Sequence, residues 1–123
     1  MEDLTVEQAV TVHRRLMEEA EGDTRVVSEA NLIQMVFRAN ITEDIVLRAS
    51  LVFWSLCAFP AFREGNERTA LTLAEQVLAD NGYCIRGDRS ALLVLAQRIQ
   101  EFSSEPEEID QWFIDNTRIA IER

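Results

Sequence analysis

Apolar residues recur at intervals of three and four along most of this chain of 123 residues. Residues at that spacing lie on one face of an α-helix, so the pattern predicts amphipathic helices that pack against one another. We expect about six helices, over residues 6–19, 29–38, 43–59, 66–81, 89–102 and 105–123. No stretch alternates between apolar and polar residues as a half-buried strand does. The pattern therefore predicts an all-α fold, with residues 1–123 forming a single domain.

Short polar residues mark where the helices begin, because a Ser, Thr or Asp side chain can accept a hydrogen bond from the first turn. The candidate N-caps are Thr5, Ser28, Thr42, Asp88 and Ser104. Gln8 and Glu107 stand three residues after Thr5 and Ser104, the spacing of a capping box. Gly82 follows the fourth predicted helix and is expected to end it in a left-handed conformation.

The third predicted helix is apolar at nearly every position between Ile45 and Phe59, including Phe53 and Trp54. A helix that is apolar on all sides belongs inside a bundle. We therefore expect the other helices to surround it. In the fifth helix, the expected buried stripe consists of Leu92, Leu93, Leu95, Ala96, Ile99 and Phe102.

The stretch from Phe59 to Arg68 carries the candidate chemistry. Gly65 and Asn66 tolerate unusual backbone angles and stand directly before a helical run, so they predict a sharp turn into a helix N-terminus. Free backbone N–H groups at such an end favour an anion. Glu64 offers a carboxylate for a divalent cation, and Arg68 offers a guanidinium for phosphate. The residues suggest a metal–phosphate pocket, although a turn with a local ion pair would explain them equally simply.

This stretch resembles the signature of the Fic/Doc family, His-Pro-Phe-x-(Asp/Glu)-Gly-Asn-x-Arg. The matching positions are Phe62, Glu64, Gly65, Asn66 and Arg68. The continuation Thr69-Ala70, closed by Asn81-Gly82-Tyr83, looks like the death-on-curing (Doc) branch. Weaker similarity extends over most of the chain, in residues 12–16 and at Gly22, Glu29, Leu32, Trp112, Asn116 and Thr117. The resemblance implies a Fic/Doc-like bundle of about six helices around a central one.

The same resemblance implies transfer of a phosphoryl or AMP group from ATP to a protein hydroxyl, with elongation factor Tu as the target of the Doc proteins. Glu64 would hold Mg²⁺, and Gly65, Asn66 and Arg68 would bind the nucleotide phosphates. Phe62 would anchor the loop in the core.

Two positions depart from the family pattern. The family histidine, which acts as the general base, falls on Pro60, so no catalytic residue is intact. A general base contributes typically about 10²–10⁴ in rate. Glu67 stands where the family has Gly or Lys, and a carboxylate there opposes phosphate binding. His13 is the one histidine of the chain, and its place beside an apolar face predicts a packing role more than a displaced base.

The composition of the chain limits the kinds of partner that it can bind. The formal net charge is −10, and all 12 basic residues are Arg. Such a surface is unsuited to nucleic acids and to anionic membranes. Cys57 and Cys84 lack the spacing of a metal site, no apolar run is long enough to span a membrane, and the N-terminus shows no secretory signal. We expect a cytoplasmic protein.

Three hypotheses of function follow. The first is a Doc-like toxin–antitoxin protein whose ATP- and Mg²⁺-dependent transfer is impaired by Pro60. The second is a catalytically inactive Fic-fold binding protein, with a protein target or an antitoxin-like segment as partner. The third is an unrelated helical adaptor with a coincidental turn.

Overall fold

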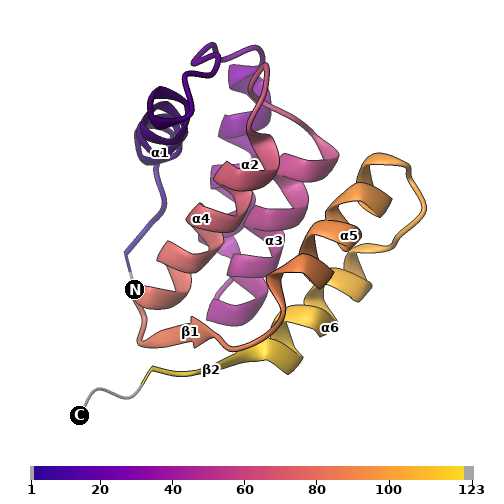
Figure 1. Cartoon of the computed structure of the whole chain (residues 1–123). Helices are drawn as coiled ribbons and strands as arrows, with labels where there is room; N and C mark the ends of the chain where they lie inside the picture. The colour runs from indigo at the N-terminus through magenta and orange to yellow at the C-terminus, as the bar shows by residue number, and fades with distance from the viewer. Residues whose placement is uncertain (1, 121–123) are drawn as a thin grey trace.

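Six helices and a two-stranded sheet make up residues 2–120, the part of the chain that the computed structural model describes (Figure 1). The helices are α1 (Val6–Glu19), α2 (Glu29–Ile41), α3 (Ile45–Ala58), α4 (Asn66–Ala79), α5 (Arg89–Gln100) and α6 (Pro106–Asn116). The strands are β1 (Tyr83–Ile85) and β2 (Thr117–Ile119). The expectation of a mostly helical fold with six helices is confirmed. Between residues 2 and 120, no helix has both the length and the apolar character needed to cross a membrane.

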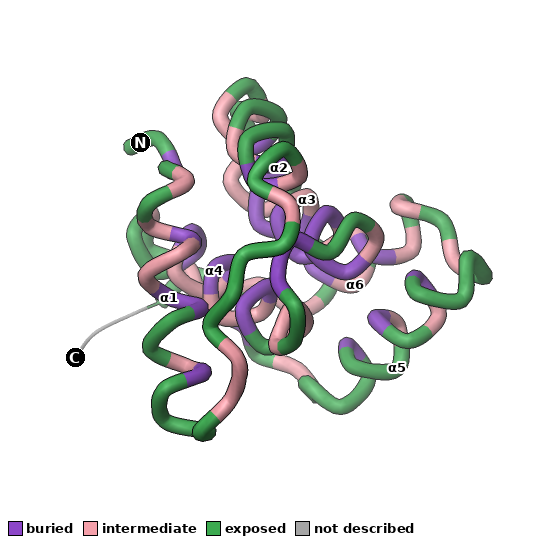
Figure 2. Tube along the Cα trace, turned by 90° about the horizontal axis from the view of Figure 1, so that it is seen from above, coloured by how far each residue is buried: buried purple, intermediate pink, exposed green. Residues whose placement is uncertain are grey.

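Helix α3 lies at the centre, in contact with α2, α4, α5 and α6 (Figures 1 and 2). Its apolar side chains Val52, Phe53 and Leu56 are fully buried, and Phe53 packs against Phe113 of α6. Burial of each such side chain stabilises the fold by about 1.5–3 kcal/mol. The apolar sequence of α3 thus explains its central place.

The predicted N-caps Thr5, Ser28 and Asp88 are confirmed, since each side chain accepts a backbone N–H of its helix. The prediction of Thr42 is wrong. Helix α2 runs three residues further than expected, and the Thr42 hydroxyl donates to the Arg38 carbonyl at 2.8 Å, a common local alternative for threonine. Asp44 caps α3 instead, accepting the Leu47 N–H at 3.0 Å.

The predicted cap at Ser104 is also wrong. The N-cap of α6 is Glu105, whose own N–H bonds the Glu108 carboxylate, and Pro106 takes the first helical position. Proline suits that position because it lacks the N–H that the first turn leaves unpaired. The capping pair therefore lies one residue later than the sequence spacing suggests.

The chain does not continue as helix after Asn116, as the sequence pattern led us to expect. It forms β2, which pairs antiparallel with β1, Tyr83 opposite Ile119 and Ile85 opposite Thr117. Strands of three residues are too short to show alternation, so the pattern could not reveal them. Residues 121–123 of the predicted helix lie outside the described part of the chain.

The stripe predicted for α5 is partly wrong. Leu92, Ala96 and Ile99 are buried, but Leu93 is 44% exposed and Phe102 is 91% exposed. Leu93 lies about 100° around the helix from Leu92, outside the buried face. Phe102 follows the end of α5 and adopts a positive φ of 56°.

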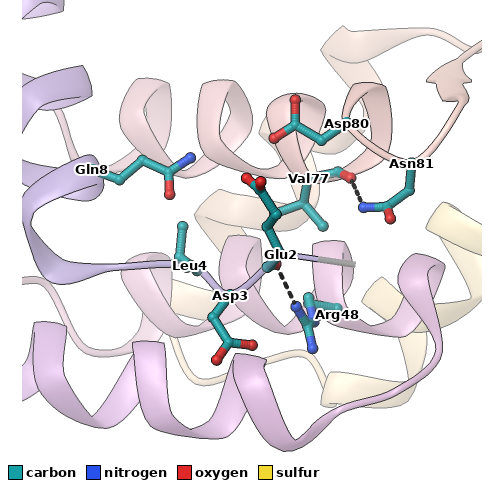
Figure 3. A pocket seen from close by; sticks show the side chains of 8 residues that line it. All are labelled: Glu2, Asp3, Leu4, Gln8, Arg48, Val77, Asp80 and Asn81. Atoms are coloured by element: carbon teal, nitrogen blue, oxygen red, sulfur yellow. Dashed lines mark hydrogen bonds between the residues drawn. The ribbon is translucent and has the colours of Figure 1, made fainter.

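A buried arginine fastens the N-terminal segment (Figure 3). Arg48 of α3 is 2% exposed and donates to the carbonyls of Glu2, Asn40 and Thr42. Asn40 and Leu4 exchange two hydrogen bonds at 2.8 and 2.9 Å. The pocket beside Arg48 holds only about 40 Å³ and reaches the C-terminal end of α4 at residues 77–81. It is therefore a structural junction at the end of α4 opposite the Gly-Asn turn.

Candidate functional site

The turn between α3 and α4 depends on Gly65. This residue adopts the left-handed region, with φ 80° and ψ 14°, and serves as the N-cap of α4. A Cβ at this position would lie 2.8 Å from Met17 Sδ and 3.6 Å from His13 Cδ2. Glycine is required both for the backbone conformation and for the close approach of α1.

The Asn66 side chain holds the turn together. Its Oδ1 accepts the N–H groups of Ala61 and Phe62, both at 3.0 Å, and its Nδ2 donates to the Phe62 carbonyl at 2.9 Å. These bonds satisfy backbone groups of the buried residues Ala61 and Phe62. The Asn66 side chain is thus committed to the loop, so only its backbone N–H is available to a ligand.

The segment before α2 braces the same loop from the outside. Val27 and Ser28 donate their N–H groups to the Ala61 carbonyl, and Val26 forms an isolated antiparallel bridge with Phe62. Asn31 of α2 donates to the Pro60 carbonyl at 3.0 Å. Pro60 itself is exposed.

Helix α1 contacts the inner side of the loop through His13. The ring is fully buried, stacks on Phe62 with centroids 3.7 Å apart, and places Nε2 2.8 Å from the Glu64 carbonyl oxygen. A carbonyl only accepts, so Nε2 carries the proton, and the buried Nδ1 has no partner in the described part of the chain. The packing role expected for His13 is confirmed, and its burial prevents it from acting as a base on a hydroxyl in solvent.

This hydrogen bond also fixes the direction of the next amide. The Glu64–Gly65 peptide is trans, so its N–H points opposite to its C=O. Because the carbonyl turns toward α1, the Gly65 N–H turns away from α1. His13 therefore aims one amide donor outward from the core.

Further unpaired backbone amides lie next to the Gly65 N–H. Within residues 2–120, the N–H groups of Asn66, Glu67 and Arg68 have no acceptor, and Gly65 supplies no side-chain cap. A left-handed residue followed by helical ones directs successive N–H groups into one concavity that attracts anions. The dipole of α4 adds partial positive charge at this end.

A surface hollow of about 300 Å³ lies at this helix end, lined by Gly65, Asn66, Glu67, Arg68 and Gln100. The Arg68 guanidinium is exposed and forms no ion pair with the residues that the structure describes. The Glu67 carboxylate instead accepts the Gln100 side-chain amide of α5. The hollow therefore combines unpaired amides and one available cation with one carboxylate that opposes an anion.

Glu64 faces a different direction. Its Oε1 accepts the Asp23 N–H at 2.6 Å, and Gly22 leaves room for that oxygen. Asp23 is in turn held by Arg25, whose hydrogen bonds lower the pKa of the Asp23 carboxyl to about 2. Among residues 2–120, no group of three or more metal-ligating side chains gathers. Glu64 can offer its second oxygen to Mg²⁺ only if nucleotide phosphates and water complete the coordination, which is a usual arrangement for this ion.

The cysteine near the hollow is not a nucleophile. Burial of Cys57 in α3, with a smaller contribution from the charge of Glu67, raises the pKa of its thiol to about 12. The thiolate is the reactive form, so Cys57 is inert near neutral pH.

The structure thus brings Gly65, Asn66 and Arg68 to one hollow, while the Glu64 carboxylate lies beside Asp23. Sequence reasoning missed Gln100, Asp23 and the bond of His13 to the Glu64 carbonyl, because each comes from an element distant in the chain and no fixed spacing links it to the loop. Comparison with protein-family models found no match for the chain, and comparison with curated proteins found no similar sequence.

Proposed function

We propose that the chain is a Doc-like protein of the Fic fold that binds the phosphates of ATP at the N-terminus of α4 and transfers a phosphoryl or AMP group poorly. The observation that carries the proposal is the orientation of the turn. Gly65 and the first turn of α4 direct unpaired N–H groups beside Arg68 and the hollow. Helix N-termini with this geometry bind phosphate.

Transfer to a hydroxyl requires that the hydroxyl proton leave as the oxygen attacks phosphorus. Pro60 has no group to accept it, and His13 is buried with Nε2 bonded to the Glu64 carbonyl. Phosphoryl transfer depends mostly on positioning and charge stabilisation, so a slow reaction is compatible with this site. We expect a rate about 10²–10⁴-fold below that of a site with a base.

Magnesium would be held by Glu64 together with the nucleotide. The ion would neutralise phosphate charge and offset the carboxylate of Glu67, which lines the hollow. In the structure the Glu64 carboxylate lies beside Asp23 and does not line the hollow, so it would have to turn toward the bound nucleotide to offer the ion its second oxygen.

A second candidate is a catalytically inactive Fic-fold binding or regulatory protein that recognises a protein target or an antitoxin-like partner. Two observations favour it: the exposed proline in place of the base, and the Glu67 carboxylate in the hollow. In both candidates the chain belongs to a toxin–antitoxin type of system and works in the cytoplasm.

Calorimetric titration with Mg-ATP tests the proposal. We expect saturable binding by the wild-type chain, at least tenfold weaker binding by Arg68→Ala, and little change in Arg63→Ala. Arg63 is the control because it is exposed on the loop just before α4, does not line the hollow, and lies 3.7 Å from the Asp23 carboxylate instead. Absence of binding at millimolar Mg-ATP would reject the nucleotide proposal and leave the second candidate.

Pro60→His tests the missing base. The backbone carbonyl that Asn31 binds is retained in this variant. We expect transfer of labelled phosphate or AMP to protein to rise about 10²–10⁴-fold. Binding of Mg-ATP without any gain in transfer would favour the inactive binding protein.

A further inference from the structure

Helix α2 carries an apolar stripe on its outer face that nothing in the described chain covers. Ile33, Phe37 and Ile41 follow one another at intervals of four and are 53%, 64% and 65% exposed. The opposite face of the helix, with Leu32, Met35 and Ala39, is buried against the bundle. Figure 2 shows α2 at the rim of the molecule, with exposed segments along it.

The stripe carries a shallow, open hollow between side chains of α2, here called the socket. A hollow of about 470 Å³ is lined by Ala30, Asn31, Ile33, Gln34 and Phe37. Four of these residues stand at positions i, i+3, i+4 and i+7, the spacing that surrounds one inserted side chain when two helices pack knobs-into-holes. The small side chain of Ala30 opens the socket. This spacing suits an apolar side chain presented by another helix.

We propose that a second copy of this chain covers the stripe, with the two α2 helices antiparallel and Phe37 of each copy in the socket of the other. In that register, Ile41 of one copy lies over Ala30 and Ile33 of its partner. The exposed Val27, just before α2, extends the apolar contact at each end. The proposal does not depend on nucleotide binding.

Charge favours a self-contact at this place. The chain has a net charge of −10, so two copies repel each other over most of their surfaces. Residues 29–41 hold one Glu29 and one Arg38, and the other polar residues there are uncharged Asn and Gln. Helix α2 is thus a neutral face of an acidic protein. On this face, two copies approach with less like-charge repulsion than over the rest of the acidic surface.

The area is also sufficient. Given their exposed fractions, Val27, Ile33, Phe37 and Ile41 present about 450 Å² of apolar surface per copy. A standard interface buries about 800 Å² per partner, of which somewhat more than half is apolar. Complete burial of this surface would supply the apolar part of such an interface.

Analytical ultracentrifugation of the full chain between 5 and 200 µM tests the proposal. We expect a reversible dimer of twice 14.1 kDa, and at least tenfold weaker association in Phe37→Glu. Val94→Glu is the matched control, because Val94 is 62% exposed on α5, away from the stripe. Circular dichroism of both variants serves as the check that they fold. A wild-type chain that stays monomeric at 200 µM, or a dimer that Phe37→Glu leaves intact, would overturn the proposal.

Disulfide trapping tests the orientation in a Cys84→Ser background. In the antiparallel register the two copies of Gln34 lie within about one helical turn of each other, while the two copies of Glu29 are more than two turns apart. We expect Gln34→Cys to form an interchain disulfide and Glu29→Cys to remain monomeric under oxidation. Cross-linking of both variants would indicate parallel helices and reject the register. Cross-linking of neither would reject the α2 contact.

Discussion

Gly65→Ala tests how closely α1 supports the candidate site. At φ 80° an L-residue costs about 1–2 kcal/mol relative to glycine. The added methyl group would also lie 2.8 Å from Met17 Sδ, so the Met17 side chain must move. Overpacking of this kind costs about 1–3 kcal/mol. We expect the free energy of unfolding to fall by about 2–5 kcal/mol in total.

Gly82→Ala separates the two contributions. Gly82 has almost the same φ, 84°, but a methyl group added there would have no other atom within 4 Å. Urea unfolding followed by circular dichroism should therefore show a loss of only about 1–2 kcal/mol. Introducing Gly65→Ala into a Met17→Val background should remove most of the difference. Equal losses for Gly65→Ala and Gly82→Ala would refute the close packing of α1 against the turn.

Three further predictions concern the groups around the turn. Asn66→Ala leaves two loop N–H groups unpaired and should lower the unfolding free energy by about 2–4 kcal/mol, whereas Asn66→Asp keeps the acceptor and should cost less; equal losses in urea titrations would contradict the bonding scheme. Because the pKa of the Cys57 thiol is about 12 in the folded chain and 9.0 is its ordinary value, stability should decline as pH rises from about 9 to 12, and Cys57→Ala should show a shallower decline. Nitrogen NMR at pH 7.5 should find a proton on His13 Nε2; an Nε2 without a proton would contradict the bond to the Glu64 carbonyl.

Local chemistry made much of the fold predictable. Thr5, Ser28 and Asp88 cap their helices as expected, and the apolar run of α3 occupies the centre of the bundle. The errors fall where two local solutions compete. Thr42 can cap the following helix or bond back to Arg38, and the sequence alone does not decide between them. The β1–β2 pair joins segments more than 30 residues apart, which no local pattern reveals.

The candidate site was predictable in its backbone and not in its surroundings. Gly65 and Asn66 predict a turn into a helix, and the structure has this turn at the start of α4. The hydrogen-bond partner of each side chain depends on tertiary packing. The Asn66 amide turns back to the loop, and Glu64 turns to Asp23 across 41 residues of sequence. His13 reaches the same loop across 51 residues, so its support of the turn could not be inferred from spacing.

The most direct test of the central claim is a nitrogen–proton NMR titration of the wild-type chain with Mg-ATP. If the turn binds phosphate, the backbone amides of Gly65, Asn66, Glu67 and Arg68 should show the largest shifts, saturating together, and inorganic pyrophosphate should move the same four signals. Amide signals at the opposite end of α4, such as that of Asn81, should stay in place. Unchanged signals at residues 65–68 at millimolar Mg-ATP, or shifts centred elsewhere, would contradict the account.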